Sequence, residues 1–380
     1  MRLLQISAHF SPNVGGVETH LDDLVRVLVN KNFDVFVLTY SPLTIKTRWK
    51  IFENGKKLTV FRIPWIAGLF YKFVRWPILE FLYLLPGLLL FTPFAILTFN
   101  PKVIHAHGLV AGFVGVFWGR LFGKKVIIST HSIYNFPKSG LYRSFVNWIF
   151  ENADWCLGLS KQATSEIESL GISRTKVKKF TYWIDLEKFK KILDAKNEQV
   201  PSSGSKLSWR DRFVVLFVGR LVLEKGVELL LESVKSWDKD ISLKIIGSGP
   251  LENKVKEVAS KLPNVDFIQG IDHDNLPIYY SGSDILIVPS IHEEGFGRVI
   301  LESLACGTPV IGANRGAIGE AIDETVGKLI EISPENIKKQ VEYFYNHPEE
   351  LKQLAKNCRK FAERRFSEKN ADTVIRLYQE

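Results

Sequence analysis

Two glutamates stand eight positions apart after an apolar run in the C-terminal half of the chain. Residues 289–302 read Pro-Ser-Ile-His-Glu-Glu-Gly-Phe-Gly-Arg-Val-Ile-Leu-Glu, with Glu294 in a turn and Glu302 in the helix expected to begin near Gly297. Eight residues are slightly more than two helical turns, so both carboxylates can line one face and hold two separate diols. The unpaired N–H groups of the first helical turn favour hydroxyls and anions. Considered alone, two such glutamates are more often a solvated helix face.

A cationic pair follows the first strand of the same half. Residues 214–226 read Val-Val-Leu-Phe-Val-Gly-Arg-Leu-Val-Leu-Glu-Lys-Gly, so the strand delivers Arg220, and Lys225 follows at the start of the next helix. An arginine and a lysine placed there would neutralise a diphosphate and stabilise it as it leaves. Lys-Gly before a helix is otherwise common. Arg220 and Lys225 therefore indicate a diphosphate site only in combination with the glutamate segment.

Glycines and histidines follow strands of the N-terminal half. Gly15 and Gly16 allow the backbone to approach a ligand closely, but their spacing is not the dinucleotide fingerprint, so NAD binding is disfavoured. His131 closes the strand predicted over residues 126–129, and His105 and His107 follow another strand. Each histidine fits either a polar or proton-carrying role or a hydrogen-bonded structural role.

Metal chemistry has weak support in the sequence. Asp272-His-Asp274 resembles an acidic metal-binding triplet, but its place before a helix favours a capping loop. Because no other cluster has metal-ligand spacing, we expect a metal-independent mechanism with no cofactor.

Short apolar runs alternate with amphipathic stretches in both halves of the chain, which is typical of doubly wound α/β sheets. We therefore expect two Rossmann-like domains facing each other across a cleft. The predicted boundaries are residues 1–190 for an acceptor-binding domain, 191–212 for a linker, 213–362 for a donor domain and 363–380 for a C-terminal helix that crosses back. The predicted strands cover residues 3–7, 35–39, 58–63, 103–106, 126–129, 155–159, 214–218, 243–246, 265–269, 285–288 and 310–311.

Composition sets broad limits. Hydrophobic residues make up 46% of the 380 positions and charged residues 24%, which is ordinary for a globular protein. The net charge of +9 suits anionic partners, but no nucleic-acid recognition motif accompanies it. Three cysteines far from one another and the absence of a signal-peptide pattern favour a reducing, cytoplasmic setting.

The region from Lys46 to Pro101 favours contact with a membrane. Residues 81–101 contain no charge, so their length makes them a candidate span. Strands expected on both sides of them disfavour a span, and Pro86, Gly87 and Pro93 are expected to divide them into shorter helices. Lys and Arg outnumber acids before this run and alternate with aromatic residues, as in an interfacial patch. A buried helix pair under a solvated rim is the alternative. The basic residues from 46 to 75 are Lys46, Arg48, Lys50, Lys56, Lys57, Arg62, Lys72 and Arg75.

Together these segments resemble the retaining glycosyltransferases of family 4, which have the GT-B fold. Glu294 and Glu302 match the family's E-x7-E motif, and residues 307–310 match its Gly-Thr-Pro-Val turn. The resemblance implies that Glu302 holds the donor ribose, and that Glu294 contacts the transferred sugar together with N–H groups around Phe296 and Gly297. The other positions that it implies are Arg220 and Lys225 at the diphosphate, Gly15, Gly16, Gly219 and Gly249 at the donor, and His131 near the donor sugar.

The chain departs from the family pattern at two places, which puts loop contacts with the donor in question. Tyr182-Trp183 stands where Asn-Gly is frequent, and Arg315 and Gly319 stand where Gly and Pro are frequent.

The resemblance implies a UDP- or GDP-sugar donor and leaves both glutamates to bind hydroxyls, without an obvious nucleophile. A front-face displacement, in which the departing diphosphate takes the acceptor's proton, is the expected route. We expect a lipid-linked or membrane-presented acceptor and an enzyme at the inner face of the cell membrane. A soluble sugar or polysaccharide acceptor and a sugar-nucleotide epimerase are the alternatives.

Overall fold

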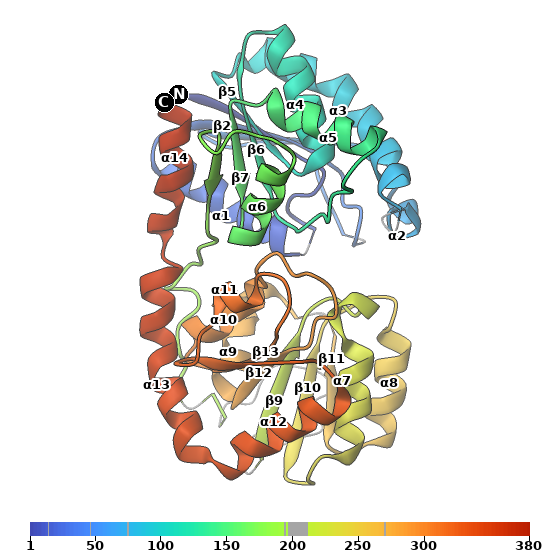
Figure 1. The fold of residues 1–380 in the computed structure, drawn as a ribbon, viewed down its shortest axis with the longest axis vertical. Helices are drawn as coiled ribbons and strands as arrows, with labels where there is room; N and C mark the ends of the chain where they lie inside the picture. The colour runs from blue at the N-terminus through green and yellow to red at the C-terminus, as the bar shows by residue number, and fades with distance from the viewer. Residues whose placement is uncertain (14, 46, 74–75, 194, 197–211, 270) are drawn as a thin grey trace. The chain divides into compact units, whose positions relative to one another are not determined.

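The computed structural model describes residues 1–13, 15–45, 47–73, 76–193, 195–196, 212–269 and 271–380. The chain forms two compact units (Figure 1): Met1–Tyr182 with Glu368–Glu380, and Trp183–Ser367. This division differs from the predicted boundaries, because residues 183–190 and 363–367 group with the second unit. Most of the predicted linker, residues 194 and 197–211, lies outside the described residues.

The first unit is built on an eight-stranded sheet in the order β3-β4-β2-β1-β5-β6-β7-β8. All neighbours are parallel except β3 and β4. The strands are nearly continuous apolar runs, as expected for a sheet covered on both faces. They are β1 (Arg2–Ser7), β2 (Asp34–Tyr40), β3 (Phe52–Asn54), β4 (Leu58–Ile63), β5 (Val103–His107), β6 (Lys125–Thr130), β7 (Trp155–Gly158) and β8 (Val177–Lys179).

Helices cover this sheet, and the last of them comes from the C-terminus (Figure 1). They are α1 (Gly16–Asn30), α2 (Phe70–Phe73), α3 (Pro77–Phe99), α4 (Leu109–Leu121), α5 (Leu141–Glu151), α6 (Lys161–Ser169) and α14 (Ala371–Gln379). The first turn of α14 forms an ion pair with the residue that follows α1. The ammonium of Lys31 lies 3.0 Å from the carboxylate of Asp372. The C-terminal residues thus complete the first unit.

The prediction that prolines divide the apolar run is wrong, because α3 is continuous through Pro86 and Pro93. The hydroxyl of Tyr40 enters the helix beside Pro86, donating to the carbonyl of Leu84 and accepting the N–H of Leu88 at 3.0 Å. Gly87 makes room for it, since a Cβ there would collide with the Tyr40 ring.

A second side chain compensates for Pro93. A proline has no N–H for the carbonyl four residues earlier, here that of Leu89. The indole N–H of Trp118 in α4 donates to this carbonyl instead, at 2.9 Å. Side chains of the surrounding unit therefore satisfy backbone groups at both prolines.

Helix α3 packs on its own sheet. Leu84, Leu88, Ala95 and Ile96 are buried in the core of the first unit. Among the described residues one helix, at 78–99, is long and apolar enough to cross a membrane, and 33% of its most apolar window is buried. The strands on either side of it, β4 and β5, belong to one sheet, as expected.

The second unit has a parallel six-stranded sheet in the order β11-β10-β9-β12-β13-β14. Its strands are β9 (Phe213–Val218), β10 (Ile241–Ile246), β11 (Val265–Ile268), β12 (Ile285–Val288), β13 (Val310–Ala313) and β14 (Gly327–Ile330). Its helices are α7 (Val227–Ser233), α8 (Glu252–Lys261), α9 (Leu276–Gly282), α10 (Arg298–Ala305), α11 (Ile318–Ala321), α12 (Pro334–Asn346) and α13 (Pro348–Arg365).

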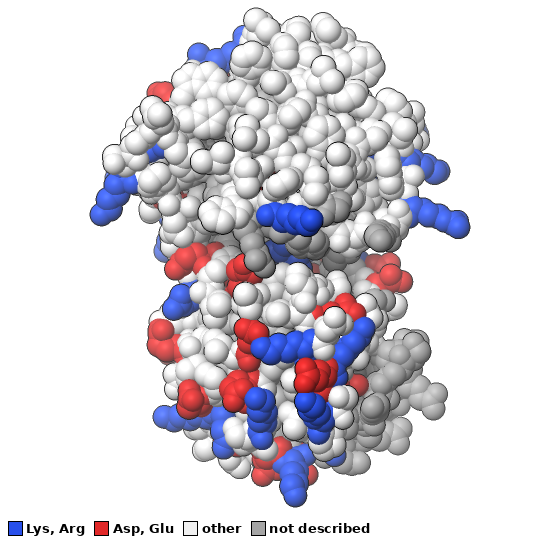
Figure 2. Space-filling view, turned by 90° about the vertical axis from the view of Figure 1, so that its right-hand side faces the viewer, with Lys and Arg blue, Asp and Glu red and all other residues white. Residues whose placement is uncertain are grey.

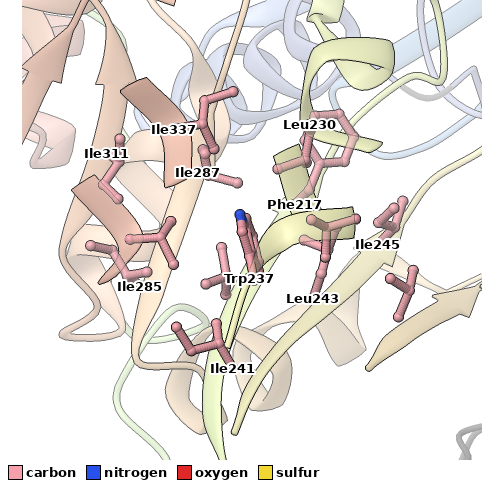
Figure 3. Close-up of a cluster of buried hydrophobic side chains, with 14 of the residues drawn as sticks. Phe217, Leu230, Trp237, Ile241, Leu243, Ile245, Ile285, Ile287, Ile311 and Ile337 are labelled. Carbon is pink, nitrogen blue, oxygen red and sulfur yellow. The ribbon is translucent and has the colours of Figure 1, made fainter. Parts of the chain in front are cut away.

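A hydrophobic core lies between this sheet and α7 and α12 (Figure 3). Trp237 is its largest side chain, and its indole N–H donates to the hydroxyl of Ser233 at 2.9 Å. The packed core keeps β9 and β12 side by side, so the loops that follow these two strands leave the same edge of the sheet. Those loops carry Lys225 and Glu294.

Candidate active site

Glu294 lies in the loop between β12 and α10 and is almost fully buried. The hydroxyl of Ser290 donates to its Oε1 at 3.0 Å, and the ammonium of Lys225 is in contact with the same oxygen. Burial raises the pKa of Glu294, but the charge and hydrogen bond of Lys225 outweigh this and hold it below the usual value. The buried carboxylate is therefore ionised and paired.

Two backbone contacts bring Lys225 to this loop. It lies in a 3-10 turn, Leu223–Lys225, that follows β9. Gly226 has a φ of 68°, and its Cα packs so closely on the carbonyl of Pro289 that a Cβ would collide with it. The N–H of Ile291 donates to the carbonyl of Glu224 at 3.0 Å. The two loops thus form one packed unit with the ion pair between them.

Glu302 has a different set of partners. Its Oε1 lies 2.9 Å from Nε2 of His273, and its Oε2 accepts the hydroxyl of Tyr280 at 2.8 Å. Arg298, one helical turn earlier, lies 3.4 Å from Oε1. Burial raises the pKa of Glu302, but the His273 contact, the Arg298 charge and the Tyr280 hydroxyl hold it below the usual value.

The start of α10 fits the prediction for Gly297. Gly297 is the residue before the helix, with a φ of 75° that favours glycine. Phe296 is buried, with its ring 5.8 Å from that of Phe366. Its side chain therefore anchors the loop, and only its backbone is left for a ligand.

The remaining predicted donor residues lie on neighbouring turns of the same unit. The N–H of Gly219 donates to the carbonyl of Ile246 at 3.0 Å, and Gly249, with a φ of 151°, packs against the backbone of Leu221. Arg220 lies between these contacts and is exposed.

His131, Gly15 and Gly16 belong to the first unit. Gly16 begins α1 and is exposed, whereas the carboxylate of Glu18 folds back against Gly15 and leaves no space for a Cβ. His131 is 8% exposed, and both ring nitrogens have partners: Nδ1 lies 2.9 Å from the Tyr182 hydroxyl and Nε2 lies 3.0 Å from Nδ1 of His107. Burial lowers the pKa of His131 to about 3, so its ring is neutral.

Several partners of the two glutamates were not predicted from the sequence. His273 was assigned to a capping loop, but the Asp272 side chain makes no capping hydrogen bond, and His273 contacts Glu302. Tyr280 and Ser290, which hold the two glutamates, carried no motif that could have marked them. The family resemblance also implies that the Ile268–Asp272 loop lies near the base of the donor, but residue 270 of this loop is outside the described residues.

Metal ligands and thiols add little to either site. Across the described ranges, no group of three or more His, Cys, Asp or Glu side chains is arranged to hold a metal ion. Cys156, Cys306 and Cys358 are free and buried.

Two family models match the chain, each over one half. Residues 14–188 match "Glycosyltransferase Family 4", and residues 202–361 match "Glycosyl transferases group 1". An uncharacterised glycosyltransferase of Methanocaldococcus jannaschii is 26% identical over 100% of this chain and 98% of its own length. A GDP-mannose-dependent alpha-(1-6)-phosphatidylinositol monomannoside mannosyltransferase of Mycolicibacterium smegmatis is 24% identical, over 87% of this chain and 85% of its own length.

Solved structures confirm the predicted fold class. Sucrose-phosphate synthase from Thermosynechococcus elongatus superposes with a TM-score of 0.82 at 22% identity, covering 100% of this chain and 98% of that chain. HepE of Anabaena, crystallised with UDP-glucose, has a TM-score of 0.75 at 16% identity, with coverages of 100% and 98%. The two parallel sheets and these neighbours identify a GT-B fold with two Rossmann-like domains.

Proposed function

This chain belongs to the glycosyltransferases described by the family 4 and group 1 models, which transfer sugar from a nucleotide sugar, and from that premise we propose a retaining enzyme that uses a UDP-sugar and a lipid-linked acceptor. The contact between Lys225 and Glu294 carries the donor half of this proposal. It places a cation suited to a diphosphate beside a carboxylate suited to sugar hydroxyls.

The proposed reaction proceeds on one face of the sugar. The bond from the anomeric carbon to the diphosphate oxygen breaks, and a bond from that carbon to the acceptor oxygen forms on the same side. The acceptor's proton passes to the departing diphosphate oxygen. Lys225 and Arg220 stabilise the negative charge that develops there, without a metal ion. Glu294 is already ionised and shielded by its partners, which suits it to orient hydroxyls.

Glu302 is proposed to hold the donor ribose. Both of its oxygens accept hydrogen bonds, yet each carboxylate oxygen has a second lone pair for a ribose hydroxyl. His273 and Tyr280 would then fix the direction of those lone pairs. UDP is the proposed nucleotide because of the fold shared with the UDP-glucose complex of HepE.

Thermal stabilisation by nucleotide sugars tests the donor assignment. UDP-glucose, GDP-mannose and ADP-glucose are compared, and we expect one of them at about 100 times its Kd to stabilise the protein by about 2.7 kcal/mol. Glu302→Gln should weaken that shift, and Glu257→Gln, at an exposed ion pair of α8, should not. The configuration of the isolated product, followed by NMR, tests retention. An inverted product, or no stabilisation by any nucleotide sugar, contradicts the proposal.

An apolar face on the first unit supports the lipid-linked acceptor. Exposed apolar side chains recur along α3 at helical spacing, and α4 and α5, which pack beside it, add more. Large exposed apolar patches mark interaction surfaces. Figure 2 shows few charged side chains on the face of this unit that carries α3 and α5. The exposed residues are Ile78, Leu79, Leu82, Leu90, Phe94, Leu97, Phe117, Leu121, Leu141 and Trp148.

The charge of the chain segment that carries this face suits an anionic bilayer. Between residues 64 and 150 the one acidic residue is Glu80, against eight Lys and Arg. Burial raises the pKa of Glu80 to about 7, so near neutral pH it carries only part of its charge. Two residues of the Lys46–Pro101 region are not available for membrane contact. Arg62 is buried and paired with Glu53, so it cannot serve a membrane patch, and Phe70 is buried.

Sedimentation with vesicles tests the membrane contact. We expect binding to vesicles that contain an anionic phospholipid and weaker binding to phosphatidylcholine vesicles. Leu90→Glu with Leu97→Glu changes side chains that are 70% and 69% exposed, so it should abolish binding without unfolding the chain. The control is Leu193→Glu, at an 80% exposed leucine of the second unit. Equal sedimentation of both variants would exclude this face as the contact.

A further inference from the structure

The ring of His131 lies in a chain of buried hydrogen bonds that begins at Tyr182. The Tyr182 hydroxyl contacts Nδ1 of His131, and Nε2 of His131 contacts Nδ1 of His107. Nε2 of His107 lies 2.8 Å from Oε1 of Gln5, and the Gln5 amide nitrogen lies 3.4 Å from the hydroxyl of Tyr378 in α14. These five side chains are all buried.

The orientation of the Gln5 amide sets the direction of every bond in this chain. An amide oxygen only accepts, so Nε2 of His107 must carry the proton. His107 is neutral because burial holds its pKa well below the usual value, so its Nδ1 accepts. His131 then donates from Nε2, and its Nδ1 accepts the Tyr182 hydroxyl. One protonation pattern satisfies all of these contacts in this orientation.

Tyr182 also marks the place where the chain leaves the first unit, because Trp183 begins the second. The return crossing follows Ser367, and the Asn370 side chain after it donates to the Tyr182 carbonyl at 3.2 Å. The His20 ring of α1 stacks on Tyr182 with centroids 4.3 Å apart. The backbone, ring and hydroxyl of Tyr182 are therefore each held within the first unit.

We propose that Tyr182 is a positioning residue: its hydroxyl donates to the Nδ1 left free by the tautomer that Gln5 and His107 impose, holds the His131 ring in one orientation and ties it to the place where the chain leaves the first unit. The inference rests on the proposed function only in that His131 serves the transfer. It gives a physical reason for a departure from the family pattern, since Asn-Gly at 182–183 would supply neither this hydroxyl nor the ring stacked on His20. Tyr182 acts through His131, and no contact of Tyr182 with substrate is involved.

Histidine labelled with ¹⁵N tests this without any activity measurement. In the wild-type protein, the two ring nitrogens of His131 should appear with Nε2 protonated and Nδ1 as a hydrogen-bond acceptor across neutral pH. Tyr182→Phe removes only the hydroxyl and keeps the ring that stacks on His20. The Nδ1 resonance of His131 should then shift towards that of a free acceptor, with the fold unchanged by circular dichroism.

Activity gives the second readout. Tyr182→Phe should lower kcat about tenfold, the effect expected from one lost buried hydrogen bond, with the KM for the donor nearly unchanged. Tyr343→Phe is the control, because it removes a hydroxyl bonded to the exposed Glu350 in the second unit. The inference is overturned if wild-type His131 is protonated at Nδ1, or if Tyr182→Phe changes neither its resonances nor kcat. If the wild type transfers no sugar, the proposed function fails, while the NMR result still decides the inference.

Discussion

The imidazole of His273 lies 2.9 Å from the carboxylate of Glu302, although 29 positions separate the two residues. His273 precedes α9 and Glu302 lies within α10, so the contact joins two helices that pack together in the second unit. The Tyr280 hydroxyl of α9 holds the other carboxylate oxygen. A buried carboxylate with its oxygens fixed from two directions is prepared to receive hydroxyls at set angles.

His273→Ala should weaken nucleotide binding. Burial raises the pKa of Glu302, and the contact with His273 lowers it. Without the imidazole the pKa therefore rises, and the carboxyl group is a poorer acceptor. We expect the Kd of the preferred nucleoside diphosphate to rise about tenfold by titration calorimetry, which corresponds to one charged hydrogen bond. His347→Ala, at an exposed histidine of the same unit, should bind normally. An unchanged Kd in His273→Ala would show that this contact is structural alone.

Lys225→Ala should reduce turnover far more than it disturbs folding. The lost cation no longer stabilises the leaving diphosphate, and losses of about 10²–10³ in kcat are typical of such groups. Lys235→Ala, at a surface ion pair of the same unit, provides the comparison. Adding Glu294→Gln to Lys225→Ala should recover stability, because the buried side chain is then a neutral amide that needs no cation, but it should not recover turnover. Full turnover in Lys225→Ala would refute the diphosphate assignment.

Tyr40→Phe should destabilise the first unit. The substitution leaves the carbonyl of Leu84 and the N–H of Leu88 without their partner in a buried helix, which costs about 1–3 kcal/mol. Urea denaturation followed by circular dichroism measures the change. Tyr345→Phe, at a surface hydroxyl, should have little effect. Equal midpoints for the two variants would mean that the Leu84 carbonyl and the Leu88 N–H do not depend on the Tyr40 hydroxyl.

Stability should fall when the pH is lowered from neutrality towards 3. Burial lowers the pKa of His105 to about 3, whereas the unfolded histidine keeps its ordinary value near 6.5. Between these values the unfolded state binds more protons than the folded state, so the free energy of unfolding rises with pH. Each such histidine contributes about 1.4 kcal/mol per pH unit.

Urea denaturation at several pH values measures this slope. His105→Gln should reduce the slope by about 1.4 kcal/mol per pH unit. His347→Gln, at an exposed histidine of the second unit, is the matched control. The same slope in His105→Gln and the wild type would mean that His105 titrates normally in the folded protein.

The parallel strands of both units could be predicted because each is a run of apolar residues bounded by turns. The strands β4 and β12 have the predicted limits, and the other predicted strands differ by one or two residues. The strands β3, β8 and β14 were missed, since they read FEN, VKK and GKLI and so form no continuous apolar run. The spacing of Glu294 and Glu302 and the Lys225-Gly226 pair were also sufficient to point to a donor site.

The sequence by itself thus determined the fold class, the family and the chemical groups of the donor site, because these depend on residue type and local spacing. The tertiary structure alone decided which groups meet. It made α3 continuous by supplying Tyr40 and Trp118 from other elements, and it joined Glu302 to His273 and His131 to Tyr182. The physical reason is that a buried polar group must find a partner, and the partner is chosen by packing between elements far apart in the chain.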